Sequence, residues 1–220
     1  MKILKNGRRR TAMLTSALAL VLIPFSAGTA SANTTPGWGD DMPDVIWDCN
    51  NGNADSCQYH EQNAETELGK RRQASNVISN CASNQPVTLT RTDSNTSSTE
   101  YAFEQQTSVE VSAGFSDTFE AGMKASESQS ETWKVGSAHT ATETHTSTIP
   151  PGQQGAWWFA PYVRHSQGYL EVHYGSRNHG HYIWYYPGNG GLPGVDVLTP
   201  VFLPGTGELK GVWYWATWNC

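Results

Sequence analysis

The sequence lacks the short motifs that mark common catalytic centres. It contains no G-x-S-x-G nucleophile turn, no H-E-x-x-H zinc motif and no phosphate-binding loop. A glycosidase with two catalytic carboxylates is the remaining enzymatic alternative, because the fold and not the sequence spacing brings such a pair together. We therefore predict that the protein is not an enzyme and holds no cofactor.

Basic residues are also scarce. The chain has 14 Lys and Arg against 20 Asp and Glu, and residues 1–32 contain five of the bases and none of the acids. Residues 33–220 therefore have nine bases against 20 acids, a net charge of −11. Such an acidic chain repels nucleic acid and gains nothing from anionic lipid. Nucleic acid is excluded as a partner, and membrane contact would need apolar side chains or a receptor.

Long apolar runs are missing after the start of the chain. Residues 12–25 (AMLTSALALVLIPF) follow a basic stretch and precede the small-residue site Ala30-Ser31-Ala32, which is the layout of a secretory signal peptide. No later stretch is long and apolar enough for a membrane helix. We expect cleavage after Ala32 and a secreted, extracellular mature chain of about one domain.

Cysteines are few but even in number. An even count in an exported chain indicates disulfides. Cys49, Cys57, Cys81 and Cys220 allow three pairings, of which we favour Cys49–Cys57 as a local loop and Cys81–Cys220 as a clamp on the last residue. Their spacings of 8, 24 and 139 match no zinc pattern, so no metal site is predicted.

Helix signals are few and strand signals are many. Residues 58–75 are the one expected helix, short and N-terminal, with Lys70–Arg72 interpreted as its solvated end. From about residue 86 the chain turns to Thr, Val, Ser and aromatic residues, which is strand composition. The predicted fold class is mainly β: an elongated antiparallel sheet or β-sandwich with long amphipathic strands.

Changes of composition divide the chain into four parts. The turn at residues 149–152 (IPPG) separates a Ser/Thr-rich stretch from an aromatic one. The predicted parts are a signal peptide at 1–32, a loop and helix segment with a disulfide at 33–85, a long-stranded module with an amphipathic hairpin at 86–155, and an aromatic-rich β region packing on the same domain at 156–220.

The stretch from Val109 to Ala125 alternates with a period of two. Its odd positions are apolar except Asp117, and its even positions are polar or glycine. Such a pattern puts the odd residues on one face of a strand. Seventeen residues exceed the usual strand of about 3–10. Two interpretations remain: a long strand of a soluble sheet, or one strand of a membrane hairpin in a barrel closed by several chains. The lipid-facing residues would be Val109, Val111, Ala113, Phe115, Phe119, Ala121 and Met123.

The second arm of such a hairpin is predicted after a polar tip at 126–131 (SESQSE). Residues 132–148 place threonines at most even positions, whereas the other face carries His139, Glu143 and His145. The strand propensity is high, but neither face is as apolar as a lipid-facing surface needs to be.

The alternating strand, the polar tip, the Thr-rich second strand and the exit TIPPGQQG at 148–155 together resemble the aerolysin-like β-pore-forming toxins, the group that includes epsilon-toxin and the mosquitocidal toxins. The resemblance covers about residues 86–175. It implies a soluble toxin that binds a receptor or glycan on a host or target-cell membrane and forms a homo-oligomer there. Residues 109–148 would then convert into a transmembrane hairpin. The chain departs from the family in size, since forty residues must serve as both stem and hairpin.

The C-terminal third is rich in Trp and Tyr. Core packing is one interpretation, and a platform on which sugar rings or lipid headgroups stack is the other. The second functional alternative follows from that platform: a non-lytic secreted β-protein that binds a glycan or a protein receptor. The candidate platform residues are Trp157, Trp158, Tyr182, Trp184, Tyr186, Trp213 and Trp215.

Overall fold

The computed structural model describes residues 37, 39, 41–103, 106–107, 110–123, 132–188 and 194–220. The chain divides into two units, residues 1–32 and residues 33–220, and the described residues all belong to the second. The predicted signal peptide and the predicted hairpin tip at 126–131 lie outside the described residues, so both stay predictions.

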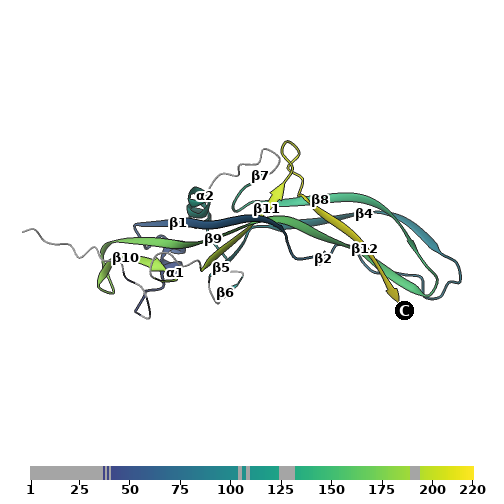
Figure 1. The fold of residues 1–220 in the computed structure, drawn as a ribbon, viewed down its shortest axis with the longest axis horizontal. Helices are drawn as coiled ribbons and strands as arrows, with labels where there is room; N and C mark the ends of the chain where they lie inside the picture. The colour runs from purple at the N-terminus through teal and green to yellow at the C-terminus, as the bar shows by residue number, and fades with distance from the viewer. Residues whose placement is uncertain are drawn as a thin grey trace, which may run out of the picture. The chain divides into compact units, whose positions relative to one another are not determined.

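The fold is mainly β with long antiparallel strands, which confirms the predicted fold class (Figure 1). The described helices are α1 (Val45–Asn51) and α2 (Ala113–Gly122). The described strands form one ten-stranded and one two-stranded sheet. They are β1 (Ser56–Leu68), β2 (Arg72–Gln73), β3 (Ile78–Ser79), β4 (Val87–Ser98), β5 (Glu100–Phe103), β6 (Gln106–Thr107), β7 (Thr132–Trp133), β8 (Ala138–Ile149), β9 (Gln153–Asn178), β10 (His181–Tyr186), β11 (Val195–Phe202) and β12 (Gly211–Asn219).

The large sheet is organised around β9, which runs for 26 residues. One edge of β9 pairs in turn with β1, β2 and β3, and the other edge pairs with β10, β11 and β12. Pro161 lies inside this central strand although proline has no N–H to donate. It falls where the neighbour changes from β1 to β2, and its carbonyl accepts from the Gly69 N–H at 2.7 Å. The missing donor therefore removes no ladder bond on that edge.

The two faces of β9 are covered at different ends. Even-numbered residues such as Leu170 and Val172 face the main core, which includes residues of α1, α2 and β5. Odd-numbered Phe159 belongs instead to a small cluster with Ala141 of β8 and Leu209. The even face of residues 154–162 and the odd face of residues 165–173 are less completely covered, and their larger side chains stay half-buried.

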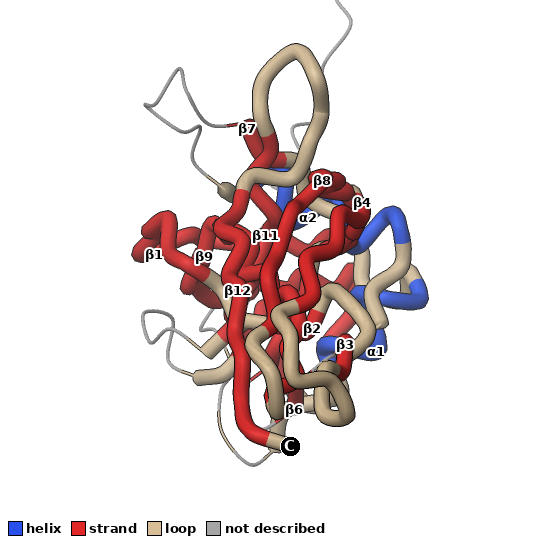
Figure 2. Tube along the Cα trace, turned by 90° about the vertical axis from the view of Figure 1, so that its right-hand side faces the viewer, coloured by secondary structure: helices blue, strands red, loops and turns tan. Residues whose placement is uncertain are grey.

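The two-stranded sheet consists of β4 and β8, which lie side by side over twelve residues each (Figure 2). Its outer face is a double row of threonines whose hydroxyl groups bond across the strands at 2.7–2.9 Å. The pairs are Thr88–Thr148, Thr90–Thr146, Thr92–Thr144 and Thr96–Thr140. Its inner face packs on the large sheet, where the buried His145 ring stacks on Trp157 with centroids 3.9 Å apart. A polar outer face and a half-polar inner face explain why neither looked apolar in the sequence.

The helix predicted for residues 58–75 is wrong. The segment forms β1, β2 and the connection between them, and β1 pairs with β9 from Ser56 opposite His173 to Leu68 opposite Tyr162. The segment has no apolar stripe of helical period, so pairing with β9 decides its structure. Lys70–Arg72 is consequently not a helix end, and Arg72 lies opposite Phe159 in β2.

Both disulfides have the favoured pairing. Cys49–Cys57 joins α1 to the start of β1, and Cys81–Cys220 joins the residue after β12 to the segment after β3. The Cys220 N–H also donates to the Gly152 carbonyl at 3.1 Å. The C-terminal end of the chain is thereby fixed to the turn that opens β9.

Removing the long-range disulfide should cost more stability than removing the local one. The Cys81→Ser/Cys220→Ser variant opens a loop with a sequence separation of 139, and Cys49→Ser/Cys57→Ser one with a separation of 8. The chain-entropy model gives losses of about 5 and about 2.5 kcal/mol in the free energy of unfolding. Urea denaturation of both variants measures the difference. Equal losses would show that the Cys81–Cys220 disulfide stabilises the fold no more than the local one does.

Candidate functional site

The segment between β4 and β8 is the candidate site. Ser98 ends β4, Ala138 begins β8, and these two residues are cross-strand partners. Residues 99–137 therefore form an insertion at the open end of a strand pair. The described part of the insertion folds as β5, β6, α2 and β7, and both β5 and β7 pair with β11 of the large sheet. Because β5 and β7 pair with β11 and not with β4 or β8, the insertion can detach from the large sheet without breaking the β4–β8 pair.

The strand predicted for residues 109–125 is wrong in its described part, because residues 113–122 form α2. The Ser112 side chain caps the helix and accepts from the Phe115 N–H at 3.4 Å. Phe115, Phe119 and Met123 are spaced by four, so they fit a helical stripe as well as a strand alternation. Tertiary packing of these three side chains, all buried, selects the helix.

The aromatic side chains of α2 fill the main core. Phe119 is 0% exposed, and its ring centroid lies 5.2 Å from that of Tyr59, 5.2 Å from Tyr101 and 4.9 Å from Phe115. Phe115 is 2% exposed and stacks on Phe103 at 6.2 Å. Full burial of each such side chain contributes about 1.5–3 kcal/mol. This aromatic cluster is the principal contact that holds α2 in place.

Polar and steric contacts fix the two ends of α2. At its start, the Ser112 N–H donates to Asn50 Oδ1 at 2.6 Å, and the Ser112 hydroxyl donates to the Asn50 carbonyl at 3.0 Å. At its end, Gly122 packs so closely on β1 that an added Cβ would lie 1.9 Å from the Tyr59 carbonyl oxygen. The helix therefore fits its place only with glycine at position 122.

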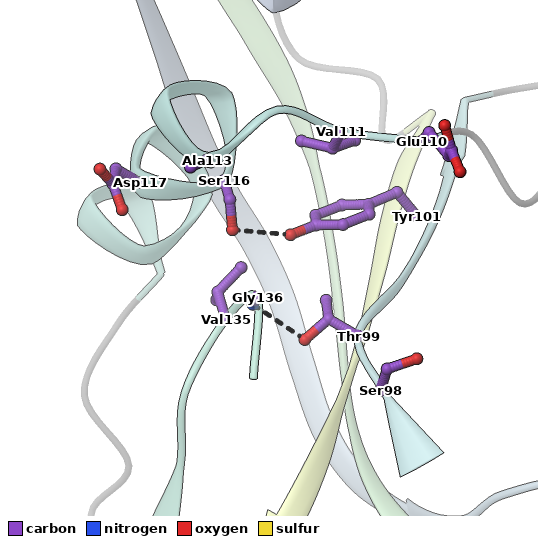
Figure 3. A pocket seen from close by; sticks show the side chains of 10 residues that line it. All are labelled: Ser98, Thr99, Tyr101, Glu110, Val111, Ala113, Ser116, Asp117, Val135 and Gly136. Carbon is purple, nitrogen blue, oxygen red and sulfur yellow. Dashed lines mark hydrogen bonds between the residues drawn. The ribbon is translucent and has the colours of Figure 1, made fainter. Parts of the chain in front are cut away.

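A cavity of about 500 Å³ lies beside α2 (Figure 3). The Tyr101 and Ser116 hydroxyl groups share a hydrogen bond of 2.9 Å across it, and the Gly136 N–H donates to Thr99 Oγ1 at 3.0 Å. Its lining lies within residues 98–136, so the end of β4 and the insertion line it together. The lining residues are Ser98, Thr99, Tyr101, Glu110, Val111, Ala113, Ser116, Asp117, Val135 and Gly136. A segment packed around such a space has fewer contacts to lose on opening.

The predicted lipid-facing residues do not share a face in this structure. Phe115, Phe119 and Met123 are buried, Val111 is half-buried, and Ala113 and Ala121 are exposed. Val109 lies outside the described residues. Substituting Asp for Phe115 or Phe119 would therefore bury a charge in the soluble protein and destabilise it, so these two substitutions cannot test membrane insertion by themselves.

The predicted aromatic platform is divided among several places. Trp184 is 1% exposed and belongs to the main core. Trp157, Trp213 and Trp215 share the face of the large sheet that β8 covers, whereas Trp158 lies on the opposite face. Tyr186 packs at 6.2 Å on Phe103, and Tyr182 carries the Arg177 guanidinium at 5.6 Å over its ring. Sequence analysis missed Tyr214, the direct partner of Trp158, because the strand pairing had to be known first.

Neither described helix is long and apolar enough to cross a membrane. No protein-family model matches the sequence, and no curated protein matches it. Among solved structures the chain is similar to the parasporin-2 Bacillus thuringiensis toxin that recognizes cancer cells, at 13% identity over 75% of this chain and 74% of that chain, with a TM-score of 0.31. A TM-score of that size is too low to support a conclusion about fold or function.

Two glycines of α2 provide a matched pair for testing its docking. Gly122→Ala is expected to displace the helix from β1, whereas Gly114→Ala, which meets open space, should stabilise the helix by about 0.5–1 kcal/mol. Hydrogen exchange of peptides covering residues 110–123 should be faster in the first variant and slower in the second. Similar exchange in both variants would show that the contact at Gly122 does not hold the helix.

Alkaline pH should weaken the same cluster. Burial raises the pKa of Tyr101 above its usual range, although the Ser116 hydrogen bond opposes the shift. The unfolded chain loses this proton at about pH 10 while the folded chain retains it, so the stabilisation is complete below about pH 10 and falls as the pH rises further. Urea midpoints between pH 8 and 11 should decline less steeply in Tyr101→Phe than in the wild type. Identical slopes would show that ionisation of Tyr101 does not contribute to the loss of stability.

Proposed function

We propose that the protein is a secreted, pore-forming-toxin-like protein that binds a cell surface, oligomerises and inserts an amphipathic β-hairpin made from residues 99–137. The observation that carries the proposal is the register of the β4–β8 pair. Each step forward along β4 is a step back along β8, from Val87 opposite Ile149 to Ser98 opposite Ala138. The ladder ends where the insertion begins.

Continuing this ladder through the insertion defines a hairpin. Thr99 would lie opposite Ser137 and Ala113 opposite Met123, with the turn near Thr118. This register differs from a hairpin with its tip at 126–131, because β8 already has β4 as its partner. The membrane arms would then be the residues on either side of Thr118, and β8 would belong to the stem.

The continued register places the apolar residues together. Residues directly opposite one another have the same parity, so the odd positions of both arms share one face. That face would carry Val111, Ala113, Phe115, Phe119, Ala121 and Met123, and it lies opposite to the threonine rows of β4 and β8. The arm from Val109 to Asp117 has nine residues, close to the ~9–11 that a tilted transmembrane strand needs. Glu143 and His145 would stay in the stem, while Asp117 would lie at the turn and Glu127, opposite Val109, would lie at the other end of the apolar stretch.

Conversion would exchange one set of contacts for another. The insertion would lose its pairing with β11, the Asn50–Ser112 hydrogen bonds and the burial of Phe115 and Phe119. Exposing two phenylalanines to water is unfavourable by about 1.5–3 kcal/mol each, so conversion is favoured where they meet lipid. One hairpin per chain cannot satisfy its edges in hydrocarbon, so several copies have to contribute one each.

The alternative is a non-lytic secreted protein that binds a glycan or a protein through its aromatic surfaces. It is supported by rings that remain half-exposed on β9 and β12, including Trp158 and Tyr214. Release of dye from liposomes and from host-type cells separates the two functions, because the alternative binds without release.

A cross-linking experiment tests the proposed hairpin directly. In α2 the Cα atoms of residues 113 and 123 are about 15 Å apart along the helix, whereas in the continued ladder their Cβ atoms are about 4.5–5.5 Å apart. Ala113→Cys/Met123→Cys should therefore form a disulfide on membranes and not in solution. The matched control is Ala113→Cys/Thr144→Cys, which reports a tip at 126–131. Dye release without the 113–123 cross-link would reject this register, and neither release nor cross-link would favour the alternative.

A further inference from the structure

An aromatic surface on the large sheet belongs neither to the insertion nor to the main core. It lies on the even-numbered face of the first half of β9 and on the neighbouring strands, opposite to the face that β8 covers. We call it the aromatic stripe and define it by Leu68, Arg71, Trp158, Tyr162, Lys210, Tyr214 and Trp218. Trp158 and Tyr214 are direct cross-strand partners, and Leu68 is the partner of Tyr162. Leu68 and Trp218 are among the exposed large apolar side chains, at 43% and 36%.

Two cations lie over the rings of the stripe. The Arg71 guanidinium is 5.4 Å from the Trp158 ring centroid and 5.6 Å from that of Tyr214. The Lys210 ammonium is 4.9 Å from the Tyr162 ring. Within the part of the chain that the structure describes, Arg71 forms no ion pair with a carboxylate. A guanidinium stacked on rings keeps its N–H donors in its own plane, where an incoming anion can reach them.

The stripe lies in a region poor in acidic residues, although the chain as a whole is acidic. Residues 33–220 carry a net charge of −11, yet residues 144–170 and 209–220 contain no Asp or Glu. The nearest acids of β1 are Glu65 and Glu67, which lie opposite His165 and Val163 and therefore on the other face of the sheet. On the even face Glu61 is paired with the Arg164 guanidinium at 2.6 Å. The stripe thus combines aromatic rings with two cations in a part of the sheet where β9 and β12 contribute no carboxylate.

We propose that the aromatic stripe docks on the phosphate-bearing headgroup layer of a phosphatidylcholine bilayer. Trp and Tyr favour the membrane–water interface, where their rings meet both apolar and polar surroundings. Arg and Lys donate charge-assisted hydrogen bonds to phosphate oxygens. A zwitterionic bilayer supplies those phosphates without the net negative charge that would repel so acidic a chain. The inference rests on the proposed function, to which it adds the surface and the lipid chemistry of first contact.

Binding to pure phosphatidylcholine vesicles tests the stripe without requiring a pore. Co-sedimentation should detect the wild-type protein on vesicles, and Arg71→Gln/Trp218→Ser should reduce its partition about ten-fold. Both positions are exposed, so the fold should survive, and near-ultraviolet circular dichroism checks this. Arg177→Gln/Tyr182→Ser is the matched control, because it removes another cation–ring pair from the same sheet, between β9 and β10. Lys210→Gln is an independent second variant that should weaken binding in the same direction.

The outcomes separate this inference from the pore. Wild-type protein that does not bind the vesicles, or equal losses in the stripe and control variants, would overturn it. Binding of the wild type to a glycan or to cells, lost in the stripe variant and never seen on vesicles, would overturn the lipid assignment in favour of a glycan platform. Stripe-dependent vesicle binding without dye release and without the 113–123 cross-link would support the stripe and reject the pore.

Discussion

The structure depends on a single requirement: the backbone groups of a 26-residue strand must be paired along its whole length. No other described strand is as long as β9, so each edge of β9 is shared by three successive strands. The breaks between those strands fall where β9 can tolerate them, as at Pro161. Because the covering elements also change along β9, each of its faces is core at one end and surface at the other. The main core around α2 and the aromatic stripe are two ends of one even-numbered face.

The strand composition of the second half could be predicted from local sequence, and the pairing of Cys49 with Cys57 followed from their proximity. The structure of residues 113–122 could not be predicted in this way. Phe115, Phe119 and Met123 satisfy both a period of two and a spacing of four, and the helix is selected by Tyr59 and Tyr101, which come from other parts of the chain.

Strand pairings between residues far apart in the sequence also could not be predicted. The hairpin interpretation paired residues 132–148 with residues 109–125, whereas β8 pairs with β4 on the far side of the insertion. The aromatic third was recognised from composition, but its division into Trp184 in the core, Trp157 under β8 and Trp158 on the open face depends on parity along β9. Arg71 was interpreted as part of a solvated helix end, and only the β2–β9 pairing brings it to Trp158.

The two-stranded sheet of β4 and β8 has one further consequence. Each strand has a partner on one side, and its other edge carries backbone donors and acceptors that the described ladder does not use, apart from bonds such as that of the Leu209 N–H to the Thr140 carbonyl. The two edges belong to different strands and are not equivalent. If β4 of one copy pairs with β8 of the next, the contact is heterologous, whereas pairing of β4 with β4 is isologous and ends with two copies. A heterologous contact adds each new copy with the same rotation relative to the one before. The size of that rotation then decides whether the assembly closes into a ring or continues as a filament.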